Sequence, residues 1–236
     1  MTLHILATGT SRGIGRAIVE RFATDDVRIV GHATTPGPDR IAADLAMPAG
    51  ATALWNMALD QLDGRIDILI NNAGIFEAAP VDLPQQEWSD AWGRTLQVNL
   101  TAAADLCRHA VLHFRDRPDG GRIVNVASRA AYRGDSPAHW HYAASKAGMV
   151  AMTKSIARGY AQDAILAFAV CPGFTLTGMA GDYVESRGGD KLLADIPLGR
   201  VAQPEEVAEA VHFLSLTAPP SMTGAVLDIN GASYVR

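Results

Sequence analysis

Short apolar runs alternate with longer amphipathic stretches along almost the whole chain, and this alternation limits the fold more than any other feature. The runs are rich in Val, Ile and Leu and cover residues 3–8, 27–33, 66–74, 121–128, 165–173 and 225–231. Stretches of helical composition lie between them, at 14–24, 50–63, 85–116, 142–162 and 204–217. Such alternation is typical of parallel βαβ units, and strands without polar alternation suit a sheet covered on both faces. The sequence therefore predicts an α/β fold with a doubly wound parallel sheet flanked by helices.

Composition points to one domain. The 236 residues are 48% hydrophobic, enough for one sizeable core, so we expect a single domain over residues 1–236.

The net charge of −5 offers no basic surface to nucleic acid or to an anionic membrane. No segment has the pattern of a membrane span or a signal peptide. Cys107 and Cys171 form neither a disulfide framework nor a metal cluster, so we expect a cytoplasmic protein without a metal.

A glycine-rich loop directly follows the first apolar run. The segment ATGTSRGIGRAI carries Gly9, Gly13 and Gly15 between the first predicted strand and the first predicted helix. Glycine there lets the backbone approach a phosphate closely, and the helix N-terminus offers N–H groups and a positive dipole end to a pyrophosphate. The loop lies at the first strand–helix junction of an alternating chain, which favours a dinucleotide site.

Tyr142 and Lys146 lie four residues apart in the segment HYAASKAG. In a helix, this spacing places two side chains on one face, with Cβ atoms about 5–6 Å apart. An ammonium group beside a phenol favours the phenolate and would bring the tyrosine pKa closer to neutrality. A tyrosine tuned in this way could act as a proton donor or acceptor near pH 7. The alternative is a solvated helix face with no chemical role.

Six motifs occur in order along the chain: TGTSRGIG at 8–15, NNAG at 71–74, Asn99 in VNL, Ser128 in VNVAS, YAASK at 142–146 and PG at 172–173. In order and approximate spacing they resemble the short-chain dehydrogenase/reductase family. The resemblance extends to PLGRVAQPEEVAEAVHFLS and TGAVLDINGA near the C-terminus, and so covers essentially the whole chain. It implies a Rossmann-like fold and an enzyme that moves a hydride between a nicotinamide and a carbonyl or alcohol carbon.

The resemblance also implies catalytic roles for Asn99, Ser128, Tyr142 and Lys146. The tyrosine matching Tyr142 exchanges a proton with the substrate oxygen, and the serine matching Ser128 hydrogen-bonds that oxygen. The lysine matching Lys146 lowers the tyrosine pKa and holds the nicotinamide ribose. The asparagine matching Asn99 anchors a water relay to the lysine. These roles suit the chemistry, because hydride addition leaves negative charge on oxygen, where hydroxyl donors and an ammonium stabilise it.

Cofactor contacts are likewise implied by the matching motifs. Asp44, followed by Leu45 at the end of a short third strand, matches the acid that contacts the adenine amino group. The other positions expected to bind the cofactor are Gly9, Ser11, Arg12, Gly13, Ile14 and Gly15 in the loop, Asn71, Ala73 and Gly74 under the adenosine ribose, Pro172, Gly173, Thr175 and Thr177 at the nicotinamide end, and also His32, Tyr142 and Lys146.

The end of the second strand favours NADP(H), with NAD(H) also possible. NAD users of the family commonly have a carboxylate there, which accepts from the ribose 2′-hydroxyl and repels a 2′-phosphate. This chain reads VRIVGHATT, with no carboxylate but with His32, Thr34 and Thr35. Arg12 lies where NADP-preferring relatives often place a basic residue. Histidine is a weaker phosphate ligand than arginine, so dual use remains open.

Three functions are consistent with these residues. The first is NADPH-dependent reduction of a ketone, such as a 3-oxoacyl thioester or a small carbonyl compound, to a secondary alcohol. The second is an NAD-dependent secondary alcohol dehydrogenase, since one site catalyses both directions. The third is a nucleotide-binding sensor without turnover, against which the intact Ser128, Tyr142 and Lys146 argue.

Several features concern substrate and assembly rather than chemistry. Residues 174–198 form a long irregular stretch, which we interpret as a substrate loop. His139, Trp140 and His141 precede Tyr142 and either pack locally or line the substrate pocket. Trp88 and Trp92 lie on one face of the predicted helix 85–116, which packs into the core or against another subunit. We expect a homotetramer or a homodimer.

Overall fold

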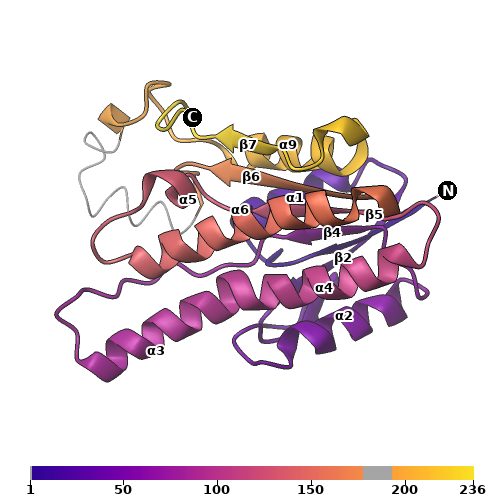
Figure 1. Cartoon of the computed structure of the whole chain (residues 1–236), viewed down its shortest axis with the longest axis horizontal. Coiled ribbons are helices and arrows are strands. Elements are labelled where there is room, and N and C mark those ends of the chain that lie inside the picture. Colours follow the sequence, from indigo (N-terminus) through magenta and orange to yellow (C-terminus); the bar gives the residue numbers. More distant parts are fainter. Residues whose placement is uncertain (1, 178–192) are drawn as a thin grey trace.

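The computed structural model describes residues 2–177 and 193–236 and has one seven-stranded sheet as its centre (Figure 1). All the strands are parallel, in the order β3-β2-β1-β4-β5-β6-β7. Their bounds are β1 Leu3–Ala7, β2 Val27–Ala33, β3 Arg40–Ala42, β4 Ile68–Asn71, β5 Gly121–Val126, β6 Ile165–Pro172 and β7 Val226–Ile229. The order reverses between β1 and β4, as in a doubly wound Rossmann-like fold, so the predicted fold class is confirmed.

Helices cover both faces of the sheet. α1 (Gly13–Phe22) and α9 (Pro204–Leu216) pack on one face. α2 (Gly50–Gln61), α4 (Ala102–Arg115) and α6 (Trp140–Tyr160) pack on the other. Other elements are the short helix α5 (Ala130–Arg133) and the 3-10 turns η2 (Ala161–Asp163) and η3 (Pro220–Met222). α3 (Gln85–Leu96) extends beyond the helical layer (Figure 1).

Alternate residues of each central strand face opposite layers. Ile5 packs toward α1 and α9, whereas the next residue, Leu6, packs toward α2 and α4. The same division separates Val124 from Ile123 in β5. Both faces are buried, and this is why the strands appear in the sequence as uninterrupted apolar runs.

The predicted helix 85–116 is not one regular helix. It divides into α3, a π-helical turn η1 (Gln97–Thr101) and α4. Within η1, the amide of Asn99 bonds the backbone of Ile75, donating to its carbonyl at 2.9 Å and accepting from its N–H at 2.8 Å. A local π-helical turn of this kind is common at functional sites, and composition does not reveal it.

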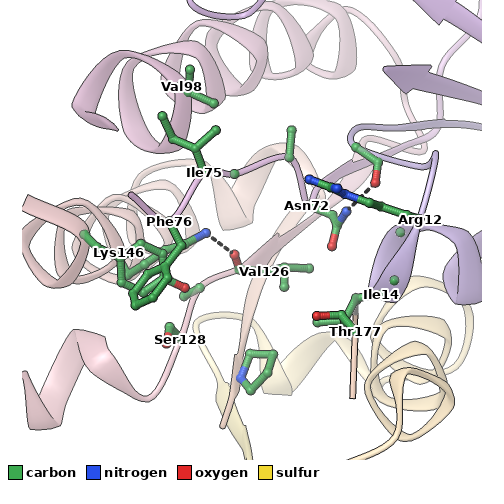
Figure 2. Close-up of a pocket in the computed structure, with 18 of the residues that line it drawn as sticks. Arg12, Ile14, Asn72, Ile75, Phe76, Val98, Val126, Ser128, Lys146 and Thr177 are labelled. Atoms are coloured by element: carbon green, nitrogen blue, oxygen red, sulfur yellow. Dashed lines mark hydrogen bonds between the residues drawn. The ribbon is translucent and has the colours of Figure 1, made fainter. Parts of the chain in front are cut away.

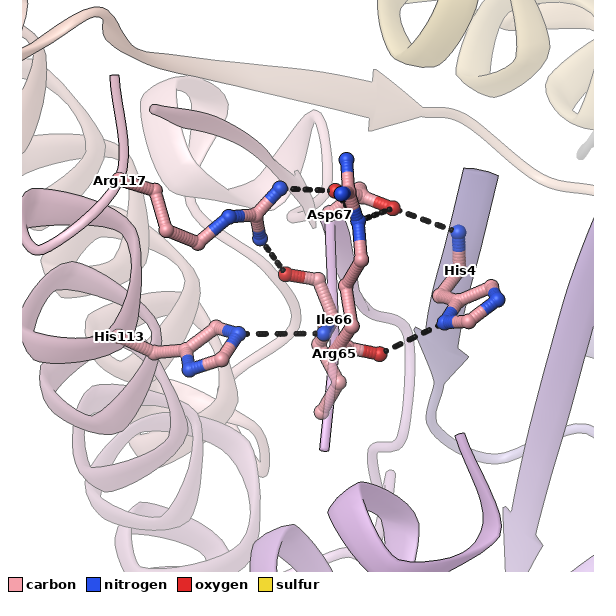
Figure 3. A network of polar contacts seen from close by, with 6 residues as sticks. All are labelled: His4, Arg65, Ile66, Asp67, His113 and Arg117. Carbon is pink, nitrogen blue, oxygen red and sulfur yellow. Dashed lines mark hydrogen bonds and ion pairs between the residues drawn. The ribbon is translucent and has the colours of Figure 1, made fainter. Parts of the chain in front are cut away.

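A polar network lies at the amino ends of the central strands (Figure 3). Asp67, 5% exposed, precedes β4 and accepts hydrogen bonds from the backbone N–H of His4 at 2.8 Å and from Arg65 Nε at 2.9 Å. Arg117 pairs with the same carboxylate and also donates to the carbonyl of Ile66 at 2.6 Å. These contacts join β1, β4 and the segment after α4 at the end of the sheet opposite the loops described next.

The carboxyl ends of β1, β2, β4, β5 and β6 all open toward one side of the molecule. This edge is where ligands bind in open parallel sheets. Within residues 2–177 and 193–236, no helix is long and apolar enough to cross a membrane.

Candidate functional site

A cavity of about 510 Å³ lies at the carboxyl ends of the strands (Figure 2). Its walls contain most of the residues singled out from the sequence. These are Gly9, Ser11, Arg12, Gly13, Ile14, Gly15, His32, Asp44, Leu45, Ala73, Gly74, Ser128, Tyr142, Lys146, Pro172, Gly173, Thr175 and Thr177. Asn71 and Asn99 do not line it.

The glycine loop packs so closely against its neighbours that side chains would not fit at its glycine positions. A Cβ at Gly15 would lie 2.0 Å from the carbonyl oxygen of Gly9 and 2.6 Å from Nδ2 of Asn72. Gly9 and Gly13 have φ angles of +69° and +53°, which disfavour L side chains. α1 begins at Gly13 without a side-chain cap and without an acidic residue in its first turn. The open N-terminus and the glycine cradle fit a dinucleotide pyrophosphate.

Asn72 holds this loop against β4. Its Nδ2 donates to the carbonyls of Thr8 and Gly9, each at 3.0 Å, and its backbone N–H donates to the hydroxyl of Thr8 at 3.0 Å. The sequence interpretation named the neighbouring Asn71, which does not line the cavity. Asn71 faces the sheet interior, where it donates to Oδ1 of Asn125 on β5 at 2.9 Å. Because side chains alternate along a strand, one position decides between the cavity and the core.

His32 lines the cavity but has backbone partners at both ring nitrogens. Nδ1 accepts from the N–H of Gly9 at 3.3 Å, and Nε2 donates to the carbonyl of Ala43 at 3.0 Å. The ring is 2% exposed, and burial lowers its pKa below the ordinary value, which favours the neutral form. In the structure His32 also joins the glycine loop to the segment after β3.

The wall between β2 and η1 forms the far end of the cavity. Arg12, Thr34 and Asp44 line it together with Leu45 and Ala46. Asp44 lies two residues beyond the end of β3, and its Oδ1 accepts from the N–H of Ala46 at 2.9 Å. No carboxylate follows β2 directly, since residues 32–35 read HATT.

Tyr142 lies on the first turns of α6 and faces the cavity beside Ser128. Burial of the phenol raises its pKa to about 12, and the hydrogen bond with Ser128 acts in the opposite direction. The Ser128 oxygen also accepts from the N–H of Ala130 at 3.1 Å. The sequence predicts that Lys146 lowers the tyrosine pKa. In the structure burial has the largest effect on the Tyr142 pKa and favours the protonated phenol at neutral pH.

Lys146 is buried one helical turn from Tyr142. Its Nζ donates to the carbonyl of Val126 at 2.9 Å (Figure 2). The same Nζ lies 5.9 Å from the centre of the Tyr142 ring. Burial lowers the pKa of Lys146 to about 8. The ammonium form therefore still predominates at pH 7, close to the phenol of Tyr142.

Asn99 is close to Lys146 without facing the cavity. A Cβ at Gly74 would lie 3.3 Å from Oδ1 of Asn99 and 3.5 Å from Nζ of Lys146, so both side chains approach the same backbone. Asn99 is fully buried, and its amide is occupied by Ile75 and by Ser145, to which Nδ2 donates at 3.3 Å. Its side chain therefore positions the backbone after β4 and joins η1 to α6.

Aromatic rings pack around Tyr142. Phe76 packs edge-on against Tyr142, with ring centres 4.8 Å apart, and stacks on His139 at 3.9 Å. His139 and His141 are 3% and 1% exposed and pack locally, whereas Trp140 is 52% exposed. None of these last three residues lines the cavity.

The sequence interpretation missed a group of cavity residues that follow the strand ends. They are Ala33, Ala46, Asn72, Ile75, Phe76, Glu77, Arg94, Val98, Val126, Ala127 and Arg129. Most lie within or next to recognised motifs, so extending each motif by two or three positions would have found them. Arg94 carried no such signal. Within the described part of the chain, no cluster of His, Cys, Asp and Glu could hold a metal ion.

Comparison with known sequences gives consistent relatives. The family described as Enoyl-(Acyl carrier protein) reductase matches residues 9–232. The chain is 34% identical to 3-oxoacyl-[acyl-carrier-protein] reductase FabG of Vibrio cholerae, over 98% of this chain and 96% of that one. It is 32% identical to the Escherichia coli protein of the same name, with the same coverage.

Solved structures agree with the sequence comparison. The ligand-free aldohexose dehydrogenase of Thermoplasma acidophilum superposes with a TM-score of 0.86 at 28% identity, covering 100% of this chain and 95% of that one. A short-chain dehydrogenase family protein of Francisella tularensis superposes with a TM-score of 0.82 at 25% identity, covering 99% of both chains.

Proposed function

Because the chain belongs to the short-chain dehydrogenase/reductase family and is an NAD(P)-dependent oxidoreductase acting on carbonyl or alcohol groups, we propose that it reduces a ketone to a secondary alcohol with NADPH. The observation that carries this proposal is one cavity that joins the glycine cradle to Ser128, Tyr142 and Lys146. The substrate is a 3-oxoacyl-type or small carbonyl compound, by analogy with the FabG relatives.

In this proposal the protein orients the substrate and supplies a proton, while bound NADPH supplies the hydride. Ser128 donates a hydrogen bond to the carbonyl oxygen, and Tyr142, protonated at neutral pH, transfers its proton to that oxygen as negative charge develops. The Lys146 ammonium stabilises the resulting phenolate. Asn99 positions the backbone next to Lys146.

The remaining cavity residues would hold the cofactor. The N–H groups at the start of α1 would bind the pyrophosphate, and the backbone at Ala73 and Gly74 would contact the adenosine ribose. Asp44 would serve the adenine, and Thr175 and Thr177 the nicotinamide; all of these residues line the cavity. Lys146 additionally serves the nicotinamide ribose hydroxyls, as the family resemblance implies.

Replacing Tyr142 by Phe tests the reaction. We expect Tyr142→Phe to lower kcat with a ketone panel by about 10²–10⁴-fold, because it removes the proton and keeps the ring. NADPH affinity, measured by nicotinamide fluorescence, should change by less than about threefold. Tyr132→Phe is the matched control, since Tyr132 does not line the cavity. If Tyr142→Phe keeps more than about a tenth of wild-type kcat, the proton donor is another group.

The preference for NADPH rests on Arg12 and on the absence of a carboxylate after β2. Because His32 fixes the glycine loop, a carboxylate is better introduced at Thr34, which lines the cavity. We expect Arg12→Ser with Thr34→Asp to shift the ratio of kcat/KM for NADPH and NADH toward NADH. A wild-type protein that already prefers NADH would instead support the alternative, an NAD-dependent secondary alcohol dehydrogenase.

We also propose a cytoplasmic homotetramer or homodimer in which residues 174–198 shape the substrate site. Of that segment, residues 178–192 lie outside the described part of the chain; Phe174, Thr175 and Thr177 line the cavity. The rings of Trp88 and Trp92 pack against each other at a tilt of 32°, with centres 5.0 Å apart. Like Leu96 and Leu100, they are not fully buried within one chain. Burial of this face in a subunit contact would stabilise the assembly. Light scattering tests this, because a species at 25.0 kDa would contradict it.

A further inference from the structure

Ser145 lies on α6 directly before Lys146 and is fully buried. Its hydroxyl donates to the carbonyl of Tyr142 at 2.7 Å and accepts from Nδ2 of Asn99 at 3.3 Å. A serine that bonds a carbonyl one turn earlier needs no partner outside its own helix. Here the second bond, made by the acceptor side of the same hydroxyl, ties the first turns of α6 to η1.

Asn99 is fixed in turn by the segment that follows β4. Its amide donates to the carbonyl of Ile75 at 2.9 Å and accepts from the N–H of Ile75 at 2.8 Å. One N–H of the amide is thus used on Ile75 and the other on Ser145. A chain of buried hydrogen bonds therefore runs from the backbone after β4 through Asn99 and Ser145 to the carbonyl of Tyr142.

The same segment after β4 also reaches the ring of Tyr142. Ile75 and Phe76 are consecutive, and both line the cavity (Figure 2). Phe76 packs edge-on against the Tyr142 ring, with centres 4.8 Å apart. One short segment thus holds Tyr142 at two points, at its backbone through the hydrogen-bond chain and at its ring through Phe76. A side chain held in this way has little freedom to move away from Ser128.

We propose that Ser145 is a positioning residue, which holds Tyr142 in the place that proton transfer to the substrate requires. This inference rests on the proposed reduction of a ketone. Ser145 does not line the cavity, so it acts through the carbonyl of Tyr142 and not by contact with substrate or cofactor. One hydrogen bond can matter here, because displacing a reacting group by about 1 Å can lower a rate about 100-fold.

Ser145→Ala tests the proposal, because alanine favours the helix and only the hydroxyl is lost. We expect kcat with the ketone panel to fall about tenfold while the Kd for NADPH changes less than about twofold. The value of kcat is calculated per NADPH-binding site, so that a loss of folded protein does not count. Ser145→Thr keeps the hydroxyl and should restore kcat toward the wild-type value. An unchanged kcat in Ser145→Ala would overturn the inference.

Ser155→Ala is the matched control. Ser155 lies on the same helix, is exposed, and donates to the carbonyl of Ala151 at 3.0 Å. The control thus removes a similar bond within α6 at a site far along the helix from Tyr142, and kcat should not change. An equal loss of kcat in Ser155→Ala and Ser145→Ala would show a general effect on the helix and would overturn the inference.

A double-mutant cycle tests whether Asn99 and Ser145 act in one chain. If they do, Ser145→Ala should lower kcat little once Asn99→Ala has removed the other end of their bond. Losses of kcat that multiply independently would mean that the two residues act separately, which would overturn the inference.

The place of Tyr142 is also measured without turnover. Carbon-13 NMR is recorded on protein labelled at Cζ of its five tyrosines, and Tyr142→Phe identifies the Tyr142 signal. Ser145→Ala should shift this signal, whereas Ser155→Ala should not. A shift in a protein that reduces no ketone would leave the placement of Tyr142 by Ser145 standing and remove only the proposed function. An unshifted signal in Ser145→Ala would overturn the inference whatever the activity.

Discussion

A charged side chain is buried at each end of the sheet, and the two side chains have different kinds of partner. At the amino ends, Asp67 meets two arginines and a backbone N–H, so its pKa lies below the ordinary value although burial alone would raise it. At the carboxyl ends, Lys146 donates to the neutral carbonyl of Val126, and burial lowers its pKa to about 8. In the described part of the chain, no carboxylate pairs with Lys146.

This difference separates a stabilising site from a functional one. A buried charge with several charged partners recovers its desolvation cost, whereas a buried charge without a counterion lowers the stability of the fold. Groups with such shifted pKa values gather where chemistry occurs. The amino ends of the strands thus fix the sheet, and the carboxyl ends retain an unfavourable lysine next to Tyr142.

Neutralising Asp67 should have the largest effect on stability. Asp67→Asn leaves Arg65 and Arg117 facing an amide and should lower the free energy of unfolding by about 2–4 kcal/mol. This loss is smaller than is usual when a buried ion pair is broken, because both arginines are partly exposed. Urea unfolding at pH 7 measures it. Because the folded pKa of Asp67 is lowered, this contribution is present above about pH 4 and is lost as pH falls through the folded value. A loss below about 1 kcal/mol would remove the contrast between the two ends.

Adding a side chain in the glycine loop should have the next largest effect on stability. A methyl group at Gly15 would collide with the Gly9 carbonyl, so we expect Gly15→Ala to lower stability by about 1–3 kcal/mol and to weaken NADPH binding. Thermal unfolding and fluorescence titration measure the two effects. Gly159→Ala is the control, since Gly159 is exposed in α6 with nothing within 4 Å of an added Cβ. It should stabilise the protein by about 0.5–1 kcal/mol.

Removing the charge of Lys146 should stabilise the protein while abolishing activity. The difference between 10.5 and about 8 corresponds to about 3 kcal/mol, and loss of the bond to Val126 offsets about 1 kcal/mol. We therefore expect Lys146→Met to raise the free energy of unfolding by about 2 kcal/mol at pH 7. Unfolding in urea and kcat are measured on the same preparation.

The pH dependence of this gain provides its check. Because the folded pKa of Lys146 is lower than the unfolded one, its cost is complete below about pH 8 and fades between about 8 and 10.5, where both states become neutral. The advantage of Lys146→Met should shrink over that range. A gain that stays constant with pH would come from packing instead of charge.

The smallest effect should come from an exposed ion pair near the Asp67 network. Arg28 pairs with Asp63, whose side chain is 74% exposed. We expect Asp63→Asn to change stability by less than about 0.5 kcal/mol, since water screens the pair and Asn tolerates the positive φ of 53° at this position. A larger loss in urea unfolding would mean that burial is not what distinguishes Asp67.

Local patterns in the sequence determined the sheet, its flanking helices and most of the cavity wall. Apolar runs mark strands buried on both faces, and the glycines of the first loop leave room for a phosphate whatever their distant neighbours are. The four-residue spacing of Tyr142 and Lys146 is also local, because a helix converts it directly into proximity.

Tertiary contacts alone decided which way the polar side chains face and which partners they have. Asn71 ends β4 and donates to Asn125 on β5, whereas Asn72 follows the strand and bonds the glycine loop. The two backbone partners of His32, the bonds of Asn99 to Ile75 and the ion pair of Arg129 with Asp195 each join residues distant along the chain. Burial and pairing of a charge depend on such neighbours. The sequence could therefore name Tyr142 and Lys146, but only the folded structure decided their protonation.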